Sequence, residues 1–188
     1  FGDRRRYAIG MNVGVVQQDV FIHTASIEEN IAYGAVGAGT DLVVQAAKAA
    51  QLHDFIDGLP DGYQSLVGER GVGLSGGQKQ RATLARALAR DPLILVLDDA
   101  LSAVDTHTEA KILDDLRSVM KRRTSFIISH RVSAVMHADE ILVLDDGALV
   151  ERGTHVELIN ARGTYARLLR RQMLEEDLES RLAPTSGD

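Results

Sequence analysis

The sequence contains no cysteine and no tryptophan, and other aromatic residues are few. Without cysteine it forms neither a disulfide framework nor a zinc-thiolate site, which fits a reducing compartment. No apolar run approaches the roughly 20 residues that a membrane-spanning helix needs. The formal net charge is −6, so the charge gives no indication of nucleic-acid binding. With 45% hydrophobic and 26% charged residues, the composition is that of a globular chain rather than a disordered one.

Two further features are missing. The chain begins with Phe1 rather than Met, and its first residues lack the apolar stretch of a secretion signal. We therefore expect the sequence to be a piece of a longer protein. The phosphate-loop pattern GxxxxGK(S/T) occurs nowhere in the 188 residues.

The most informative segment that is present is LSGGQKQR, Leu74 to Arg81. Its serine and two glycines stand directly before a helix-forming stretch that ends at Asp91-Pro92. The start of a helix carries about half a positive charge and several unpaired N–H groups, so this segment predicts a phosphate-binding site. The apolar run LILVLDD that follows ends in two carboxylates, which suit a Mg²⁺ ion beside those phosphates.

Strands and helices alternate along the chain, which predicts an α/β fold with helices on both faces of a sheet. We expect strands at residues 12–18, 92–99 and 124–130, and a hairpin at 140–153 with its turn at 145–147. Residues 26 to about 91 look mainly helical and interrupt the sheet, which predicts an inserted helical subdomain. Residues 41–59 have helical apolar spacing, residues 164–182 form an increasingly charged amphipathic helix, and residues 183–188 look disordered.

Three helix starts match the capping-box pattern, in which a Ser or Thr side chain and an acidic side chain three residues later satisfy each other's backbone N–H groups. They are Ser26 with Glu29, Thr106 with Glu109, and Thr154 with Glu157.

Polar side chains follow three of the expected strands. Gln18 ends the first strand, Asp98 and Asp99 end the second, and His130 ends the third. Open α/β sheets bind ligands at the carboxyl ends of their strands, so these positions predict a ligand site. Two other glycine patterns are weaker. Residues 71–76 match GxGxxG without following a strand directly, and residues 34–40 carry Thr40 where a phosphate loop needs lysine.

These motifs together resemble the nucleotide-binding domain of ATP-binding cassette (ABC) transporters, over about Ile9 to Gln172. Five features look like motifs of this family. Gln18 resembles the glutamine of the Q-loop, Leu74–Gln78 the signature, LILVLDD the Walker B strand, Ser102–Asp105 the D-loop, and His130 the switch histidine. Three further segments are similar to those of the exporter branch of the family, in which membrane helices are fused to this domain. They are LVGERG, FIHTASIEENIAYG and DEILVLDDGALVERGTHVELI. The resemblance implies a P-loop NTPase-like core sheet with the helical subdomain inserted at about 26–91, and a charged tail at 173–188.

The resemblance also implies how the domain works. Two such domains stack head to tail, and each of two ATP molecules lies on the phosphate loop of one domain and under the signature of the other. By carry-over, the residues that contact the partner's ATP are Leu74, Ser75, Gly76, Gly77, Gln78 and Asp105. Asp98 helps to hold Mg²⁺ with Gln18 near the metal, position 99 acts on the attacking water, and His130 contacts the γ-phosphate. Phosphoryl transfer requires mostly such positioning and charge stabilisation.

The sequence departs from the family pattern in two ways. Only 17 residues precede Gln18, too few for the phosphate loop and the adenine-stacking aromatic, so the N-terminal part of the core is expected to be missing and ATP affinity in isolation to be weak. Asp99 stands where active members carry glutamate. A carboxylate withdrawn by about 1 Å can cost on the order of 100-fold in rate. This suggests the weak half of an asymmetric pair, although a slowly working Asp99 is the alternative.

The leading hypothesis is the ATPase module of a membrane exporter, with ATP and Mg²⁺ as cofactors. Its expected partners are a second nucleotide-binding domain and the transmembrane domain of an exporter, and its expected place is the cytoplasmic face of the cell membrane. The alternatives are a non-hydrolysing interaction module, a DNA-maintenance ATPase and an inactive fragment. The acidic charge and the LVGERG segment argue against the DNA-maintenance class.

Overall fold

The structure, a computed structural model, describes residues 12–35, 37, 39–68 and 71–182. The chain divides into two compact units, Phe1–Ile128 and Ser129–Asp188, each with its own apolar cluster. The disorder expected at 183–188 lies outside the described residues. Among the helices described, none combines the length and the apolar character that crossing a membrane requires.

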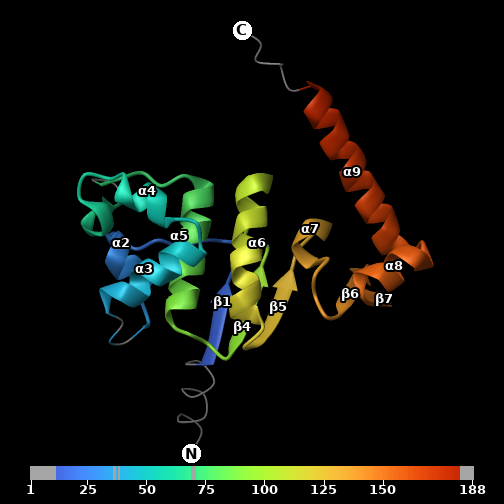
Figure 1. Ribbon diagram of the computed structural model, residues 1–188, viewed down its shortest axis with the longest axis horizontal. Coiled ribbons are helices and arrows are strands. Elements are labelled where there is room, and N and C mark those ends of the chain that lie inside the picture. Colours follow the sequence, from blue (N-terminus) through green and yellow to red (C-terminus); the bar gives the residue numbers. More distant parts are fainter. Residues whose placement is uncertain (1–11, 36, 38, 69–70, 183–188) are drawn as a thin grey trace, which may run out of the picture. The chain divides into compact units, whose positions relative to one another are not determined.

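The first unit contains a three-stranded parallel sheet (Figure 1). Its strands are β1 (Val13–Val16), β4 (Ile94–Asp98) and β5 (Thr124–Ile128), in the order β1-β4-β5. Val16 pairs with Leu97, and Leu97 pairs with Ile127. Because the strands are parallel, their carboxyl ends lie at one edge of the sheet, as the expected ligand site requires.

The chain between β1 and β4 is mostly helical, and in Figure 1 its helices gather beside β1. The elements are β2 (Ala25–Ser26), α2 (Ile27–Ala32), α3 (Thr40–Ala49), α4 (His53–Asp57), the 3₁₀ turn η1 (Gly62–Gln64), β3 (Leu66–Val67) and α5 (Gly76–Ala89). The antiparallel ribbon of β2 and β3 was not expected from the sequence, because two-residue strands are too short to show an alternating pattern.

The core of the first unit lies on one face of the sheet. Val16, Leu95 and Leu97 are buried there with Leu84 of α5 and with Ile112 of α6 (Thr106–Met120). The other face carries apolar side chains that stay accessible in the described part of the chain, with Val15 48% and Phe126 56% exposed. The alternation follows from the pleat, which turns successive side chains to opposite faces.

Two local expectations in this unit were wrong. The expected Thr106–Glu109 capping box is absent, because the N-cap of α6 is Asp105, whose carboxylate accepts from the N–H of Thr108 at 2.9 Å. Thr106 is therefore the first helical residue, and Glu109 is buried. The single helix expected over 41–59 is two helices, because Gln51 adopts a left-handed conformation with φ 53° and ends α3.

The second unit contains α7 (Val132–Val135), β6 (Ile141–Asp145), β7 (Ala148–Gly153), α8 (His155–Ala161) and α9 (Thr164–Leu182). The hairpin is confirmed: Asp145 pairs with Ala148, and the two turn residues Asp146 and Gly147 have φ 47° and 74°, as a type I′ turn requires. The capping boxes at Ser26 and Thr154 are confirmed as well. Helix α9 continues through residue 172, beyond which the charged tail was expected.

Candidate functional site

The signature segment forms an exposed helix start. Ser75 is the N-cap of α5, and its hydroxyl accepts from the N–H of Gln78 at 3.2 Å. The side-chain oxygen of Gln78 accepts in turn from the N–H of Ser75 at 2.8 Å. The Ser75 hydroxyl proton can still donate, and the N–H groups of the next two residues have no partner within the helix. This turn therefore offers several donors to an anion.

The two glycines of this turn lie against the loop that follows β4. A Cβ atom built on Gly77 would be 2.8 Å from the carbonyl oxygen of Ala103, closer than real Cβ contacts. On Gly76 it would be 3.5 Å from the Cβ of Ala103, an ordinary contact. Position 77 must therefore be glycine for the signature turn to lie this close to residues 99–105, whatever the glycine contributes to a ligand.

The sheet edge brings together Gln18, Asp98 and Asp99. Gln18 is exposed just after β1, and the half-buried Asp98 is the last residue of the neighbouring β4. The backbone N–H of Asp99 donates to the carbonyl of Ile128 at 2.9 Å, which fixes residue 99 beside the end of β5. Asp99 has φ 43°, a left-handed conformation that aspartate tolerates better than most residues do.

Carboxylate and amide oxygens are donors that suit Mg²⁺. Among the described residues no group of three or more His, Cys, Asp or Glu side chains forms a cage for a metal. Mg²⁺ is usually held by one or two carboxylates together with water and substrate phosphates, so Asp98 with Gln18 nearby fits that ion.

His130 belongs to the second unit, where α9 determines its position. Its carbonyl oxygen accepts from the side-chain amide of Gln172 at 2.6 Å. The oxygen of the same amide accepts from the N–H of Val132 at 2.9 Å, at the start of α7. Gln172 was missed from the sequence because nothing local distinguishes it from other polar residues of that helix. The catalytic role of His130 stays a prediction.

The comparison with known families decides the identity of this arrangement. The family model described as ABC transporter matches residues 2–102, more than half of the chain. The chain belongs to the ABC transporter family. The resemblance inferred from the motifs is thus confirmed.

Curated ABC transporter proteins are similar over most of the chain. The uncharacterized ABC transporter ATP-binding protein YknU of Bacillus subtilis is 54% identical over 84% of this chain and 27% of its own length. ABC transporter B family member 2 of Dictyostelium discoideum is 45% identical over 88% of this chain and 12% of its own length. The chain therefore spans less than a third of the length of these relatives.

A solved structure shows the same fold. The structure of a bacterial Atm1-family ABC exporter with ATP bound superposes with a TM-score of 0.84 and 46% identity, over 89% of this chain and 30% of that one. The mixed α/β architecture with a parallel sheet is thus that of an ABC exporter's nucleotide-binding domain.

Asp105 has a structural role in this ABC transporter domain besides its expected contact with the partner's ATP. The hydrogen bond from the N–H of Thr108 lowers the pKa of the Asp105 carboxyl below its usual 3.8, because it favours the charged form. A depressed pKa stabilises the fold above the unfolded pKa, and that contribution disappears as the pH falls through the folded value.

We therefore expect the stability difference between the wild-type domain and Asp105→Asn to depend on pH. Asparagine keeps an acceptor for the helix start but has no charge to lose, so the wild type should lose its advantage only below about pH 4. Urea unfolding at several pH values between about 2.5 and 7 would measure this. A difference that is constant over that range would contradict the assigned role of the Asp105 charge.

A buried polar network joins the segment after Gln18 to α5, and no local pattern in the sequence indicates it. Asn30 is 2% exposed, and its side chain donates to the carbonyls of His23 and Ser26, at 3.0 Å each. Its oxygen accepts from Arg86 at 2.9 Å, and that guanidinium also donates to the carbonyls of Asn30 and Phe21. Burial lowers the pKa of the Arg86 guanidinium, because desolvation disfavours its charged form.

Replacing Asn30 with alanine is expected to destabilise the domain by about 2–3 kcal/mol, because the buried carbonyls and Arg86 lose partners that water does not replace. Denaturant unfolding measures the loss. The matched control is Gln45→Ala at an exposed position of α3, for which we expect a change within about 0.5 kcal/mol. Equal stability of the two variants would contradict the network.

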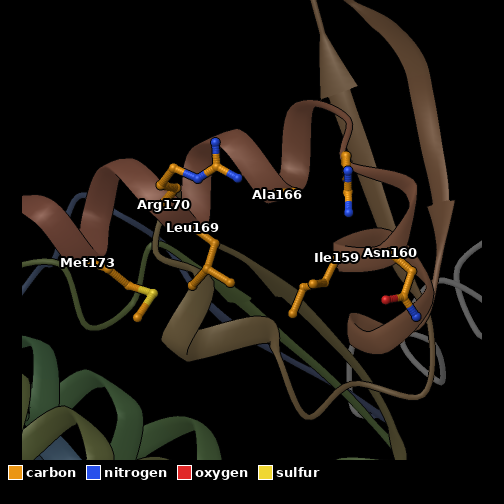
Figure 2. A pocket seen from close by; sticks show the side chains of 7 residues that line it. Ile159, Asn160, Ala166, Leu169, Arg170 and Met173 are labelled. Atoms are coloured by element: carbon orange, nitrogen blue, oxygen red, sulfur yellow. The ribbon is translucent and has the colours of Figure 1, made fainter.

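The second unit contains an open hollow between α8 and α9, shown in Figure 2. Its lining combines apolar and cationic side chains with one amide: Ile159, Asn160, Arg162, Ala166, Leu169, Arg170 and Met173. None of the expected site residues is among the residues that line it.

Proposed function

We propose that this chain is one half of a head-to-tail pair of ATP-binding domains and that its signature turn completes an ATP site whose phosphate loop comes from the partner. The observation that carries the proposal is the exposed start of α5, where Ser75 and Gln78 order each other and the N–H groups of the next two residues have no partner within the helix. The 188 residues contain no match to the phosphate-loop pattern.

The residues of the signature turn bind and orient the γ-phosphate in this proposal. The Ser75 hydroxyl, the N–H groups of Gly76 and Gly77 and the free amide protons of Gln78 are all donors, and they add to the positive end of the helix dipole. Leu74 packs against the core and anchors the turn. Such preordered donors stabilise charge in phosphoryl transfer at little cost of reorganisation.

The sheet edge serves the other ATP of the pair. Mg²⁺ there offsets the charge of the phosphates, and Asp98 with Gln18 would hold it. Asp99 accepts a proton from the attacking water, and His130 contacts the γ-phosphate. We propose that the shorter Asp99 makes this the weakly hydrolysing half of an asymmetric pair.

The similarity to exporters extends the proposal to the whole protein. A structure titled as an ABC exporter shares the fold, and a protein of Bacillus subtilis named as a putative multidrug export ATP-binding/permease protein is 45% identical over 86% of this chain. We propose that the chain powers transport through an exporter's transmembrane domain from the cytoplasmic face of the membrane, with residues 26–91 as its helical subdomain.

The absence of cysteine permits a direct test. The Ser75→Cys variant has a single thiol in the chain, and modification of that thiol by maleimide reports whether the signature turn is covered. We expect Mg-ATP to protect the introduced thiol when a partner domain with a phosphate loop is present and not when the chain is alone. A partner domain whose catalytic glutamate is replaced by glutamine binds ATP without hydrolysing it, and would keep the signature turn covered.

The control is Ser118→Cys, an exposed position on α6 outside the site, which should react equally under all conditions. Protection of the Ser75→Cys thiol by ATP in the isolated chain would contradict the head-to-tail assignment. So would an unchanged reaction in the presence of both partner and ATP.

A further inference from the structure

Gln80 is a buried amide two residues after the signature, and all its polar atoms are used by one loop. It is 3% exposed. Its oxygen accepts from the backbone N–H of Ala103 at 2.8 Å, and its nitrogen donates to the Ser102 hydroxyl at 3.0 Å. The same nitrogen has a longer contact, 3.5 Å, with the carbonyl of Asp99.

The loop that Gln80 holds is also the loop on which the signature glycines pack. Ala103 contacts Gly77 so closely that no side chain fits between them, and Gln80 binds the N–H of the same residue. Asp99 is fixed from the other side by Ile128 at the end of β5. The start of α5 and residues 99–103 are thus joined by a steric contact and by hydrogen bonds within one unit.

We propose that Gln80 is a positioning residue that holds the signature turn, Ser75–Gln78, and the hydrolytic position, Asp99, in one fixed arrangement. This rests on the proposed function, in which the signature turn serves the partner's ATP and Asp99 serves the other ATP. Gln80 then joins the two ATP sites of the pair within this chain. When the nucleotide of one site displaces the signature turn, the displacement is transmitted to the water-activating position of the other site.

The amide is the chemical group that this role requires. It supplies an acceptor for a backbone N–H and donors for a hydroxyl and a carbonyl at the same time. Glutamate keeps the acceptor but directs a carboxylate at the carbonyl of Asp99. Methionine has a similar shape and leaves the N–H of Ala103 without its partner. Either change should weaken the attachment of the loop without leaving a cavity in the core.

The experiment uses the assembled transporter that contains the full chain, and compares Gln80→Glu and Gln80→Met with Ile112→Val. Ile112 is fully buried on α6 away from these contacts, so its truncation lowers stability without touching the loop. We expect kcat for ATP to fall on the order of 10- to 100-fold in both Gln80 variants, because sub-ångström misplacement of reacting groups has costs of this size. The ATP concentration for half-maximal rate should change much less, and Ile112→Val should keep its kcat.

Hydrogen exchange measures an effect that a purely structural role of Gln80 would not produce. In the wild type, we expect ATP to slow amide exchange at residues 75–78 and at 99–103 together. In the Gln80 variants the first segment should still be protected while the second exchanges as fast as without ATP. Ser102→Ala, which removes the hydroxyl that accepts from Gln80 at 3.0 Å and leaves the bond to Ala103 in place, should give a smaller effect of the same kind.

Two results would overturn the proposal: Gln80 variants with the kcat of Ile112→Val, or joint protection of both segments in Gln80→Met. A parallel Ser75→Asp variant keeps this failure separate from that of the proposed function. If Ser75→Asp has full ATP turnover, the proposed function fails and the role of Gln80 fails with it. If Ser75→Asp is inactive while the Gln80 variants behave like Ile112→Val, only the role of Gln80 fails.

Discussion

Replacing Ser75 with aspartate is expected to lower ATP turnover by the assembled pair about 100- to 1,000-fold, the usual cost of losing one donor to a transition-state oxyanion. The substitution separates binding from folding, because aspartate is as good an N-cap as serine. Its carboxylate can accept from the N–H of Gln78 as the Ser75 hydroxyl does. However, it cannot donate, and it places a negative charge where the γ-phosphate is expected.

Steady-state ATP hydrolysis and thermal unfolding of the same preparations measure both quantities. The control is Thr154→Asn, at an exposed N-cap of α8 that has no expected ligand; asparagine keeps the cap without placing a second carboxylate against Glu157, which accepts from Thr154. Both variants should stay within about 0.5 kcal/mol of the wild-type stability, and only Ser75→Asp should lose turnover. Full turnover by Ser75→Asp would show that this turn does not face a nucleotide.

The second large expected effect is an increase in the rate of ATP hydrolysis. Asp99→Glu is expected to raise ATP hydrolysis at this chain's own hydrolytic position by roughly 100-fold, because the longer side chain advances the carboxylate by about 1 Å toward the water. The gain should come in kcat, since the groups that hold the phosphates are unchanged. Glutamate tolerates the left-handed conformation at φ 43° less well, so a stability loss of roughly 1 kcal/mol should accompany it.

Single-turnover measurements isolate this site when the partner's own catalytic acid is replaced by its amide. Asp99→Asn is the control, since it keeps the shape and removes the base, and losing a general base typically costs about 10²- to 10⁴-fold. If Asp99→Asn is as fast as the wild type, Asp99 performs no base catalysis. If Asp99→Glu is no faster than the wild type, the weak-half assignment is wrong and the non-hydrolysing interaction module becomes the better description.

The features that could be predicted from the sequence are those fixed by neighbours within a few residues. The capping boxes at Ser26 and Thr154 and the hairpin turn at Asp146-Gly147 have their interactions inside the motif itself. The capping box predicted at Thr106 failed for the same kind of reason, because Asp105, one residue earlier, is the better acceptor for the helix start. Gln51 showed no local sign of the left-handed conformation that divides α3 from α4.

The same distinction applies to the candidate site: some of its residues could be predicted from the sequence, and others could not. Gln18 and Asp98 could be placed near each other because parallel strands end at one edge of a sheet, which needs no knowledge of contacts. Gln80 could not be assigned, because its partners lie 22 and 23 residues further along the chain. Asn30 and Arg86 lie 56 residues apart, and their network was missed for the same reason.

LSGGQKQR by itself determined that this chain has a helix start suited to phosphate, since Ser75, Gly76, Gly77 and Gln78 carry the cap and the donors in consecutive positions. Only the tertiary structure decided what that helix start is attached to. Folding brings Ala103 against Gly77 and buries Gln80 on the loop that carries Asp99. Capping is local because its hydrogen bonds close within one turn, whereas the attachment depends on which distant loop packs against the helix, and that is fixed by burial of the whole core.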